Sequence, residues 1–348
     1  MRRARSTLVL AVAASLTLAA CAGADDDAPT GTGATDDATT GGDTPGASVD
    51  AFPVTIEHAF GETVIDAEPE RVVTWGWGSA DAVLALGVVP VAIPFQAYGG
   101  DSDGVLPWVA DRLAELGAPT PTVLPDSAEV PVEAIAAAQP DLILAHYSGI
   151  TAEEYEVLSA IAPTVAYPDE PWATPWREVI ETTGLALGRS DAATDVLAGI
   201  DGAVAAAAAE HPEFEGVSVA QVWDTGDTFY VYSPADPRVE FVEDLGFTTA
   251  PSVTDLDTGE STFYFTLSHE RLDELGSDLL IAYADSPDLL DAFLTSTPAQ
   301  AMAQVRDGAV AGVVGQAFVA SVSPPTALSL TWGLDDFVTL LADVVAEA

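Results

Sequence analysis

Aromatic side chains follow several of the expected strands, where they could form a binding surface. Ligands of open α/β sheets lie beyond the carboxyl ends of the strands. Aromatic faces and tyrosine hydroxyls suit a large, partly apolar ligand that also presents oxygen atoms. Strand alternation favours a position in the core for Trp75, and the same alternative stays open for Tyr147 and Trp223. The candidate residues at these positions are Trp75, Trp77, Tyr98, Tyr147, Trp172, Trp223 and Tyr283.

Arg238 is the most distinctive polar candidate, because cations are scarce in this chain. The 348 residues include 10 basic residues, all of them arginine, against 55 acidic ones. Arg238 follows the proline-containing segment 233–237 at the start of an expected helix. Its guanidinium can donate several hydrogen bonds in a fixed geometry to ligand oxygens. The alternative is an ion pair with a neighbouring acid, either Asp236 or Glu240.

Catalytic and metal-binding patterns are weak. Ser79 does not occupy a Gly-x-Ser-x-Gly elbow, because Asp81 stands two positions after it. The histidines are too scattered for a Ser-His-Asp order or for a zinc or manganese site: His58, His146, His211 and His269. We expect His146 to hydrogen-bond in the cleft rather than to bind iron. Acids are so abundant that a glycosidase-like carboxylate pair stays possible, which makes an extracellular hydrolase the alternative enzyme class.

Two series of strands and helices would position these residues. Alternating strands and helices predict open, mainly parallel α/β sheets. The first series comprises a hairpin at 54–65, strands at 71–75, 88–93, 141–145 and 164–167, and helices at 80–86, 132–138 and 151–161. The second comprises strands at 217–223, 228–232, 279–282 and 309–314, and helices at 238–245 and about 334–346. Helices at 176–187 and 190–210 lie between them, and the second would reach roughly 30 Å, enough to connect two lobes.

The N-terminal segment reads as an export signal followed by a lipid attachment site. Three arginines precede an apolar stretch at 8–20, which is typical of a secretory signal and too short to span a bilayer. Cys21 is the chain's one cysteine, and its place directly after this stretch resembles a bacterial lipobox. Residues 22–50 are mostly small or polar and cannot offset the entropy of ordering, so we expect disorder.

These features predict five segments and exclude some partners. We expect a signal peptide at 1–20, a lipid-anchored linker at 21–50, an N-terminal lobe at 51–188, an interlobe helix at 189–212 and a C-terminal lobe at 213–348. The formal net charge of −45 excludes nucleic acid binding, which requires a basic surface. A single cysteine excludes disulfides, cysteine-based metal sites and thiol catalysis in the body.

Several segments together resemble a known family. They are RVVTWGW at 71–77, ALGVVPV at 85–91, VEAI at 132–135, QPDLIL at 139–144, IAPTV at 161–165, DPRVEF at 236–241, DLGF at 244–247 and LSHERL at 267–272. In order and spacing they resemble the iron–siderophore substrate-binding lipoproteins of ABC importers, which are related to cobalamin and haem binders. The resemblance implies an α/β class III periplasmic-binding-protein fold, with two Rossmann-like lobes joined by one long helix and a ligand between them.

The resemblance also implies a function and its partners. It implies a non-catalytic receptor that delivers an Fe(III)-siderophore to an ABC transporter permease dimer. The receptor would be a monomer held on the extracytoplasmic face of the cell membrane by lipid on Cys21, with no other covalent group. Glu133 and Glu243 match the acidic residues that dock such proteins on the permease, although helix-surface charge also explains them. Few arginines favour a hydroxamate or mixed siderophore over a tris-catecholate, and haem or cobalamin is the alternative ligand.

Overall fold

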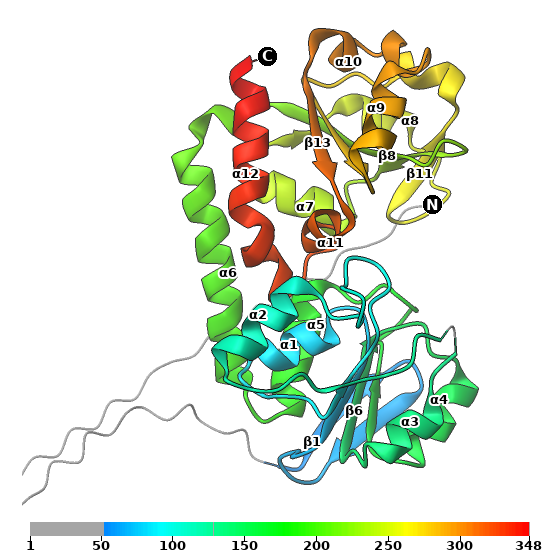
Figure 1. The fold of residues 1–348 in the computed structure, drawn as a ribbon, viewed down its shortest axis with the longest axis vertical. Helices are drawn as coiled ribbons and strands as arrows, with labels where there is room; N and C mark the ends of the chain where they lie inside the picture. Colours follow the sequence, from blue (N-terminus) through cyan, green and yellow to red (C-terminus); the bar gives the residue numbers. More distant parts are fainter. Residues whose placement is uncertain (1–51, 128, 348) are drawn as a thin grey trace, which may run out of the picture. The chain divides into compact units, whose positions relative to one another are not determined.

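The computed structural model describes residues 52–127 and 129–347. The expected signal peptide at 1–20, Cys21 and the linker at 21–50 lie outside the described residues. The body contains two α/β lobes, an N-terminal lobe from β1 to α5 and a C-terminal lobe from η1 to α12 (Figure 1). The fold predicted from the sequence is therefore confirmed.

The N-terminal lobe is built on a five-stranded parallel sheet with the strand order β5-β4-β3-β6-β7. An antiparallel hairpin precedes it, in which Val54 pairs with Ile65. Strand β6, which lies between β3 and β7, is apolar and buried from Leu142 to Ala145, as expected for a sheet covered on both faces. The elements are β1 (Val54–His58), β2 (Gly61–Ile65), β3 (Val72–Gly76), α1 (Ser79–Ala85), β4 (Ala92–Ile93), α2 (Pro107–Glu115), β5 (Thr122–Val123), α3 (Val132–Ala137), β6 (Leu142–Tyr147), α4 (Ala152–Ser159), β7 (Thr164–Ala166) and α5 (Trp176–Ala186).

The C-terminal lobe is built on a mixed six-stranded sheet with the order β11-β9-β8-β12-β13, and β10 also pairs with β8. Strands β8, β10, β12 and β13 are parallel, whereas β9 and β11 add an antiparallel edge. The elements are η1 (Pro212–Phe214), β8 (Ser218–Asp224), β9 (Phe229–Tyr232), α7 (Pro237–Asp244), β10 (Thr248–Thr249), α8 (Pro251–Leu256), β11 (Tyr264–Leu267), η2 (His269–Glu274), β12 (Leu279–Ala284), α9 (Pro287–Thr295), η3 (Ala299–Ala301), α10 (Ala303–Asp307), β13 (Val310–Val314), α11 (Gln316–Val322) and α12 (Ser329–Glu347).

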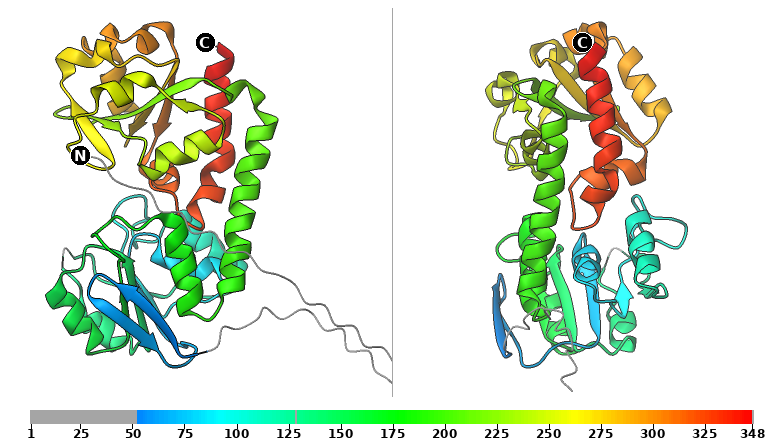
Figure 2. Two further views of the ribbon diagram at one scale, coloured as in Figure 1. Left: turned by 180° about the vertical axis from the view of Figure 1, so that it is seen from behind. Right: turned by 90° about the vertical axis from the view of Figure 1, so that its left-hand side faces the viewer.

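Helix α6 (Ser190–Glu210) connects the lobes, and α12 runs beside it (Figures 1 and 2). By length and composition α6 could also cross a membrane. Its contacts are those of a connecting helix in the body, because it packs on α5 and α12 and its Asp201 pairs with Arg177 at 2.9 Å. One apolar core includes Ile180 of α5, Ile200 of α6 and Phe337 of α12, so burial is continuous from lobe to lobe.

Two expected elements differ in extent from the observed ones. The strand expected at 88–93 is reduced to Ala92–Ile93. The Val88 N–H instead donates to the Val83 carbonyl at the end of α1, and Pro90 has no N–H for a ladder. The C-terminal helix begins at Ser329 rather than near 334. Gly333 lies inside α12, at a point where the Ser321 side chain occupies the space that a Cβ would need.

Candidate functional site

The turn after β3 carries Trp77 to the edge of the N-terminal sheet. Gly76 and Gly78 adopt φ values of +99° and +68°, which glycine reaches without strain. A Cβ on Gly76 would collide with the Tyr147 carbonyl oxygen, and the Trp77 N–H donates to that same oxygen at 3.0 Å. The glycine turn and this hydrogen bond therefore fix the backbone of Trp77 relative to Tyr147 on the neighbouring strand β6.

A first pocket, the N-terminal pocket, opens beside this turn with a volume of about 390 Å³. It brings together Trp75, Trp77 and Trp172, three of the residues predicted from the sequence. The other residues that line it are Gly76, Pro94, Phe95, Gln96, Ser127, Val130, Gly149, Ile150 and Glu154. A cavity of this size, with aromatic side chains and a few polar groups in its wall, is typical of a small-molecule site.

A second pocket, the interlobe pocket, has a volume of about 330 Å³ and walls from both lobes. Tyr147, Trp172 and Arg238 of the predicted set line it. Trp172 also lines the N-terminal pocket, so the two pockets adjoin, and together we call them the cleft. The other lining residues are Ala173, Thr174, Pro175, Tyr232, Ala235, Asp236, Pro237, Glu240, Phe263, Tyr264 and Pro324.

Trp172 stands at the boundary of the two pockets in a constrained conformation. Its φ is +61°, a left-handed value that is costly for a residue with a side chain. Its N–H donates to the Ser148 carbonyl at 3.1 Å, and its indole lies against the backbone of Gly149. Even so, 53% of Trp172 is exposed. An exposed indole held in a strained backbone is suited to contact a ligand.

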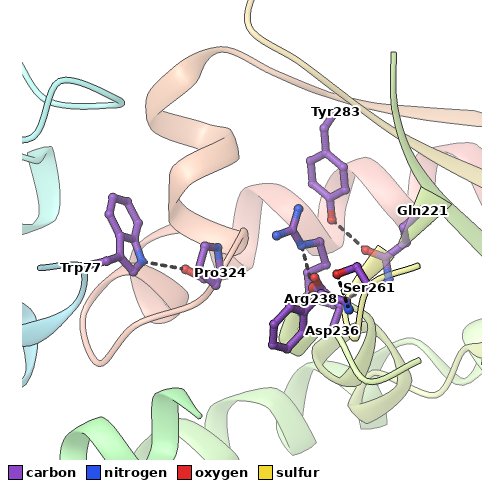
Figure 3. Close-up of polar contacts among 8 residues, drawn as sticks. Trp77, Gln221, Asp236, Arg238, Ser261, Tyr283 and Pro324 are labelled. Carbon is purple, nitrogen blue, oxygen red and sulfur yellow. Dashed lines mark hydrogen bonds and ion pairs between the residues drawn. The ribbon is translucent and has the colours of Figure 1, made fainter. Parts of the chain in front are cut away.

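Arg238 and Asp236 supply an ion pair to the C-terminal wall of the cleft (Figure 3). Arg238 Nε donates to Asp236 Oδ1 at 2.7 Å, and the guanidinium carbon lies 3.8 Å from the centre of the Tyr232 ring. Only 13% and 3% of the Arg238 and Asp236 side chains are exposed. The Asp236 carboxylate also accepts from the Arg238 N–H at 2.9 Å and so caps α7. Both alternatives for Arg238, pairing and pocket lining, are therefore present together.

Burial and the neighbouring charges shift the pKa values of Asp236 and Arg238 in opposite directions. Burial raises the pKa of Asp236, while the neighbouring Arg238 works against that rise. Burial works to lower the pKa of Arg238, but the charge of Asp236 and the nearby Tyr232 and Tyr283 raise it overall. Arg238 thus stays protonated. With Nε–H committed to Asp236, the terminal amino groups are the donors it can offer to a ligand.

Three other predicted residues lie outside the two pockets. The Trp223 ring is 6.3 Å from both the Tyr98 and the Tyr283 rings, measured between centroids. Tyr283 is 2% exposed, its hydroxyl donates to Gln221 Oε1 at 2.8 Å, and its ring lies 5.9 Å from that of Tyr232. These aromatics form a row behind the C-terminal wall, where Tyr283 supports Tyr232.

Tyr98 joins the two lobes directly. Its hydroxyl donates at 2.8 Å to Oδ1 of Asp285, which follows β12 in the C-terminal lobe. Burial and this carboxylate both raise the pKa of Tyr98, so its hydroxyl keeps the proton that it donates. Tyr98 therefore holds the lobes together at one end of the interface.

His146 lies in the core instead of the cleft. It is 1% exposed, and its Nε2 lies 3.1 Å from the Val179 carbonyl oxygen and 3.0 Å from Thr183 Oγ1 of α5. Burial lowers the pKa of His146 to about 4. The expected hydrogen-bonding role is confirmed, but its expected place in the cleft was wrong because the ring of this β6 residue points under the sheet toward α5. Ser79 is also fully buried.

The two acidic residues expected to dock on a permease occupy unlike positions. Glu133 is exposed in the first turn of α3, which precedes β6. Glu243 is exposed in the last turn of α7, where its carboxylate accepts from Thr249 Oγ1 at 2.6 Å. In the C-terminal lobe the residue placed like Glu133 is Glu270, in the first turn of η2, which precedes β12. Within residues 52–127 and 129–347, no three His, Cys, Asp or Glu side chains gather to hold a metal ion.

Some cleft residues were missed by the sequence analysis. Tyr264 begins β11 at the antiparallel edge of the C-terminal sheet and Phe263 directly precedes it. The run of aromatic and β-branched residues at 263–267 was a sequence signal for this strand. Pro324 comes from the segment between α11 and α12 and has no local signal. Its place in the cleft depends entirely on tertiary contacts.

The sequence of most of the body matches the model of a known protein family. The family described as "Periplasmic binding protein" matches residues 72–311, which is more than half of the chain. The chain belongs to the periplasmic binding protein family. Residues 72–311 reach from β3 to β13 and so include the lining of both pockets except Pro324.

Individual family members agree with this assignment. The chain is 28% identical over 239 residues to the probable siderophore-binding lipoprotein YfiY of Bacillus subtilis (strain 168), covering 67% of this chain and 70% of YfiY. The crystal structure of PiaA from Streptococcus pneumoniae TIGR4 in complex with ferrichrome is 33% identical with a TM-score of 0.76, covering 84% of this chain and 99% of PiaA. A periplasmic solute binding protein from Mycobacterium smegmatis str. MC2 155 is 29% identical with a TM-score of 0.73, covering 84% and 98%. These relatives are binding proteins.

Proposed function

We propose that this protein is an extracytoplasmic substrate-binding protein that captures a ferric siderophore between its lobes and delivers it to an ABC importer. The observation that carries the proposal is the cleft, which is lined by three tryptophans, three tyrosines and the guanidinium of Arg238 stacked on one of those tyrosines. A ferric siderophore is large, partly apolar and rich in oxygen acceptors, which suits this combination. The names of YfiY and of the PiaA–ferrichrome complex support the same ligand class.

The charges of the cleft favour a ligand of low net charge. Of the seven arginines in the described residues, only Arg238 lines either part of the cleft, and it is paired with Asp236. Glu154 and Glu240 add two further carboxylates to the lining. A strongly anionic tris-catecholate complex would meet more negative than positive charge in a partly desolvated site. We therefore assign the ligand to the hydroxamate or mixed class, in which the ferric complex is neutral or nearly so.

Intrinsic tryptophan fluorescence tests this proposal. The purified full chain is titrated with a ferrioxamine-type hydroxamate, a ferric tris-catecholate, ferric citrate, haem and cobalamin. We expect saturable quenching by the hydroxamate complex at submicromolar concentration and much weaker binding of the tris-catecholate. Trp77→Ala should weaken binding, whereas Trp332→Ala, which removes an exposed tryptophan outside the cleft lining, should not.

Other outcomes of the same titration would redirect the proposal. Equal affinity for both ferric complexes would remove the charge argument, while binding of haem or cobalamin alone would replace the siderophore as ligand. If none of the five binds, the siderophore assignment fails although family membership stands. Turnover of ester or glycoside panels would instead support the hydrolase alternative.

Delivery to a permease would use one acidic residue on each lobe. Glu133 is our candidate on the N-terminal lobe, and Glu243 and Glu270 are the candidates on the C-terminal lobe. The matching positions of Glu133 and Glu270 before β6 and β12 favour that pair. Glu133→Arg with Glu270→Arg should abolish iron uptake in cells and leave ligand affinity unchanged. Glu133→Arg with Glu243→Arg is the comparison that decides between the two C-terminal candidates.

Anchoring on the membrane would depend on Cys21. We place the protein on the extracytoplasmic face of the cell membrane as a monomer, held by lipid on this cysteine. Cys21→Ser should release the exported chain from the membrane fraction while ligand affinity stays the same. A Cys21→Ser protein that still sediments with membranes would contradict the anchor.

A further inference from the structure

The segment at 323–329 runs from the end of α11 to the first residue of α12 and contacts the N-terminal lobe. Its Pro324 carbonyl accepts from Trp77 Nε1 at 3.3 Å, and Figure 3 shows the indole edge turned toward it. Pro324 lines the interlobe pocket and Trp77 lines the N-terminal pocket. This hydrogen bond therefore joins the two halves of the cleft through one backbone atom of the C-terminal lobe.

Two residues further along, Thr326 ties the segment to a buried carboxylate. Thr326 Oγ1 donates at 2.5 Å to Oδ1 of Asp81 in α1, and Trp108 Nε1 donates to the same oxygen at 2.6 Å. Asp81, Trp108 and Thr326 are each at most 4% exposed. Burial raises the pKa of Asp81, while its two hydrogen bonds oppose the rise. A buried carboxylate is costly unless it is hydrogen-bonded, so this geometry is strongly determined.

The remaining contacts of the segment place it directly against the Trp77 turn. Thr326 N–H donates to Ser329 Oγ at 2.9 Å and Ser329 N–H donates to Thr326 Oγ1 at 3.2 Å, which fixes Thr326 at the start of α12. A Cβ on Gly78 would lie 3.2 Å from Thr326 Cγ2. Ser323 Oγ, by contrast, is buried without a partner among the described residues. The segment is thus held by the Thr326–Ser329 hydrogen bonds and by its contacts with the N-terminal lobe.

We infer that Asp81 is a positioning residue for the cleft: through Thr326 it holds the segment at 323–329 so that the Pro324 carbonyl orients the Trp77 indole. Asp81 does not touch the ligand. The effect on ligand affinity rests on the proposed function, whereas the effect on Trp77 does not. Of the residues in this network, only Trp77 was among the aromatic residues and the arginine predicted from the sequence.

Thr326→Val is the sharpest variant, because it removes the hydroxyl that joins Asp81 to the segment and keeps the side-chain shape. Thr326→Ser restores the hydroxyl. Each change is made in the full chain with Trp77 and again with Trp77→Phe, and the difference between the two emission spectra isolates the Trp77 signal. We expect Thr326→Val to shift the Trp77 emission of the unliganded protein to longer wavelength, because the indole loses its acceptor and meets water. Thr326→Ser should restore the original spectrum.

Ligand affinity supplies the second readout. We expect Thr326→Val to weaken binding of a ferric hydroxamate about tenfold, which corresponds to the loss of one well-placed contact. In the Trp77→Phe background, Thr326→Val should reduce the affinity little further, because Thr326 acts on the ligand through the Trp77 indole. Ser286→Ala, which removes the N-cap of α9, controls for a loss of helix capping elsewhere.

The outcomes separate a positioning role from a structural one. Thr326→Val with a lowered melting temperature but an unchanged Trp77 spectrum, as expected for Ser286→Ala, would overturn the proposal. An affinity loss that is as large with Trp77→Phe as without it would also overturn it. If the wild-type chain binds no ferric siderophore, the proposed function fails, and the spectrum of the unliganded protein still decides the role of Asp81. Asp81→Asn should reproduce the spectral shift in weaker form, because an amide oxygen can still accept from Thr326.

Discussion

The two lobes contribute opposite chemistry to one cleft. The N-terminal pocket contains three tryptophans and a phenylalanine and a single charged residue, Glu154. The C-terminal side of the interlobe pocket supplies the buried pair of Arg238 and Asp236 together with tyrosines. The difference indicates a division of work, in which one lobe provides apolar contact area and the other provides directed hydrogen bonds.

The origin of the difference lies in how each sheet ends. The parallel N-terminal strand β3 ends in a glycine turn, and the positive φ values of Gly76 and Gly78 allow the turn to present Trp77 to the N-terminal pocket. In the C-terminal lobe β9 leads directly into the helix α7, whose cap is Asp236. The carboxylate that caps this helix start also pairs with the guanidinium of Arg238, two residues later. The ion pair is therefore a product of the helix start itself.

Removing the positive charge of Arg238 from the C-terminal side of the cleft should produce the largest loss of affinity and stability. Arg238→Met keeps a long apolar side chain over Tyr232 but removes every donor. Hydrogen bonds to charged groups contribute about 1.5–3 kcal/mol, so we expect affinity for the ferric siderophore to fall by about tenfold to a hundredfold. Unfolding free energy should fall by about 3 kcal/mol, because Asp236 is left buried without its partner. Fluorescence titration and chemical denaturation measure the two losses.

A double variant separates these two losses. Arg238→Met with Asp236→Asn should recover most of the stability and none of the affinity, because it removes the unpaired charge without supplying a donor. Recovery of affinity in the double variant would mean that Arg238 serves the fold alone. The division between the lobes would then be wrong.

A pH series should distinguish the interiors of the lobes. Burial lowers the pKa of His146 to about 4 in the N-terminal lobe, below its usual 6.5. The unfolded chain therefore binds this proton first, and stability should fall as the pH drops from about 6.5 to 4, by about 3 kcal/mol in total. In the C-terminal lobe burial raises the pKa of Asp236, so its contribution to stability changes in the opposite direction as acid is added.

Denaturation of the wild type and of His146→Gln at pH 7, 5.5 and 4 measures this difference. The glutamine can still donate to the Val179 carbonyl, which His146 contacts, but it does not titrate. We expect the two proteins to lose stability by different amounts between pH 6.5 and 4, with the wild type losing more. Parallel curves would show that His146 has an ordinary pKa.

Trp172 tests the apolar side with a smaller effect. Trp172→Gly and Trp172→Ala both remove the wall between the two pockets, and we expect each to weaken ligand binding about tenfold. The φ of +61° is costly for alanine and not for glycine, so the glycine variant should be more stable by about 1 kcal/mol. Equal stability would mean that the backbone relaxes when the indole is removed.

The sequence predicted those site residues that are positioned by their immediate neighbours in the chain, and it missed those that are positioned by contacts between distant segments. Trp77 and Arg238 carried local signals, a glycine turn and a proline-led helix start, and both line the cleft. Tyr283 carried a similar signal at a strand end, yet its side chain faces Gln221 of the neighbouring strand. Strand alternation fixes the face of a residue but not which face the cleft occupies. Pro324 and Asp81 depend on the packing of one lobe against the other, which no local pattern reports.

The smallest effect should come from the contact that joins the lobes at their edge. Tyr98→Phe removes the hydroxyl that donates to Asp285 at 2.8 Å. One hydrogen bond contributes about 0.5–1.5 kcal/mol net, so unfolding free energy should fall by about 1 kcal/mol and ligand affinity by at most about twofold. Tyr230→Phe is the matched control, because no hydrogen bond joins its hydroxyl to another described residue and its ring lies against that of Tyr264 on the neighbouring strand. A large affinity loss in Tyr98→Phe alone would place the ligand against Tyr98 and extend the polar side of the cleft into the N-terminal lobe. A loss confined to stability keeps Tyr98 as a contact between lobes whose chemistry stays separate.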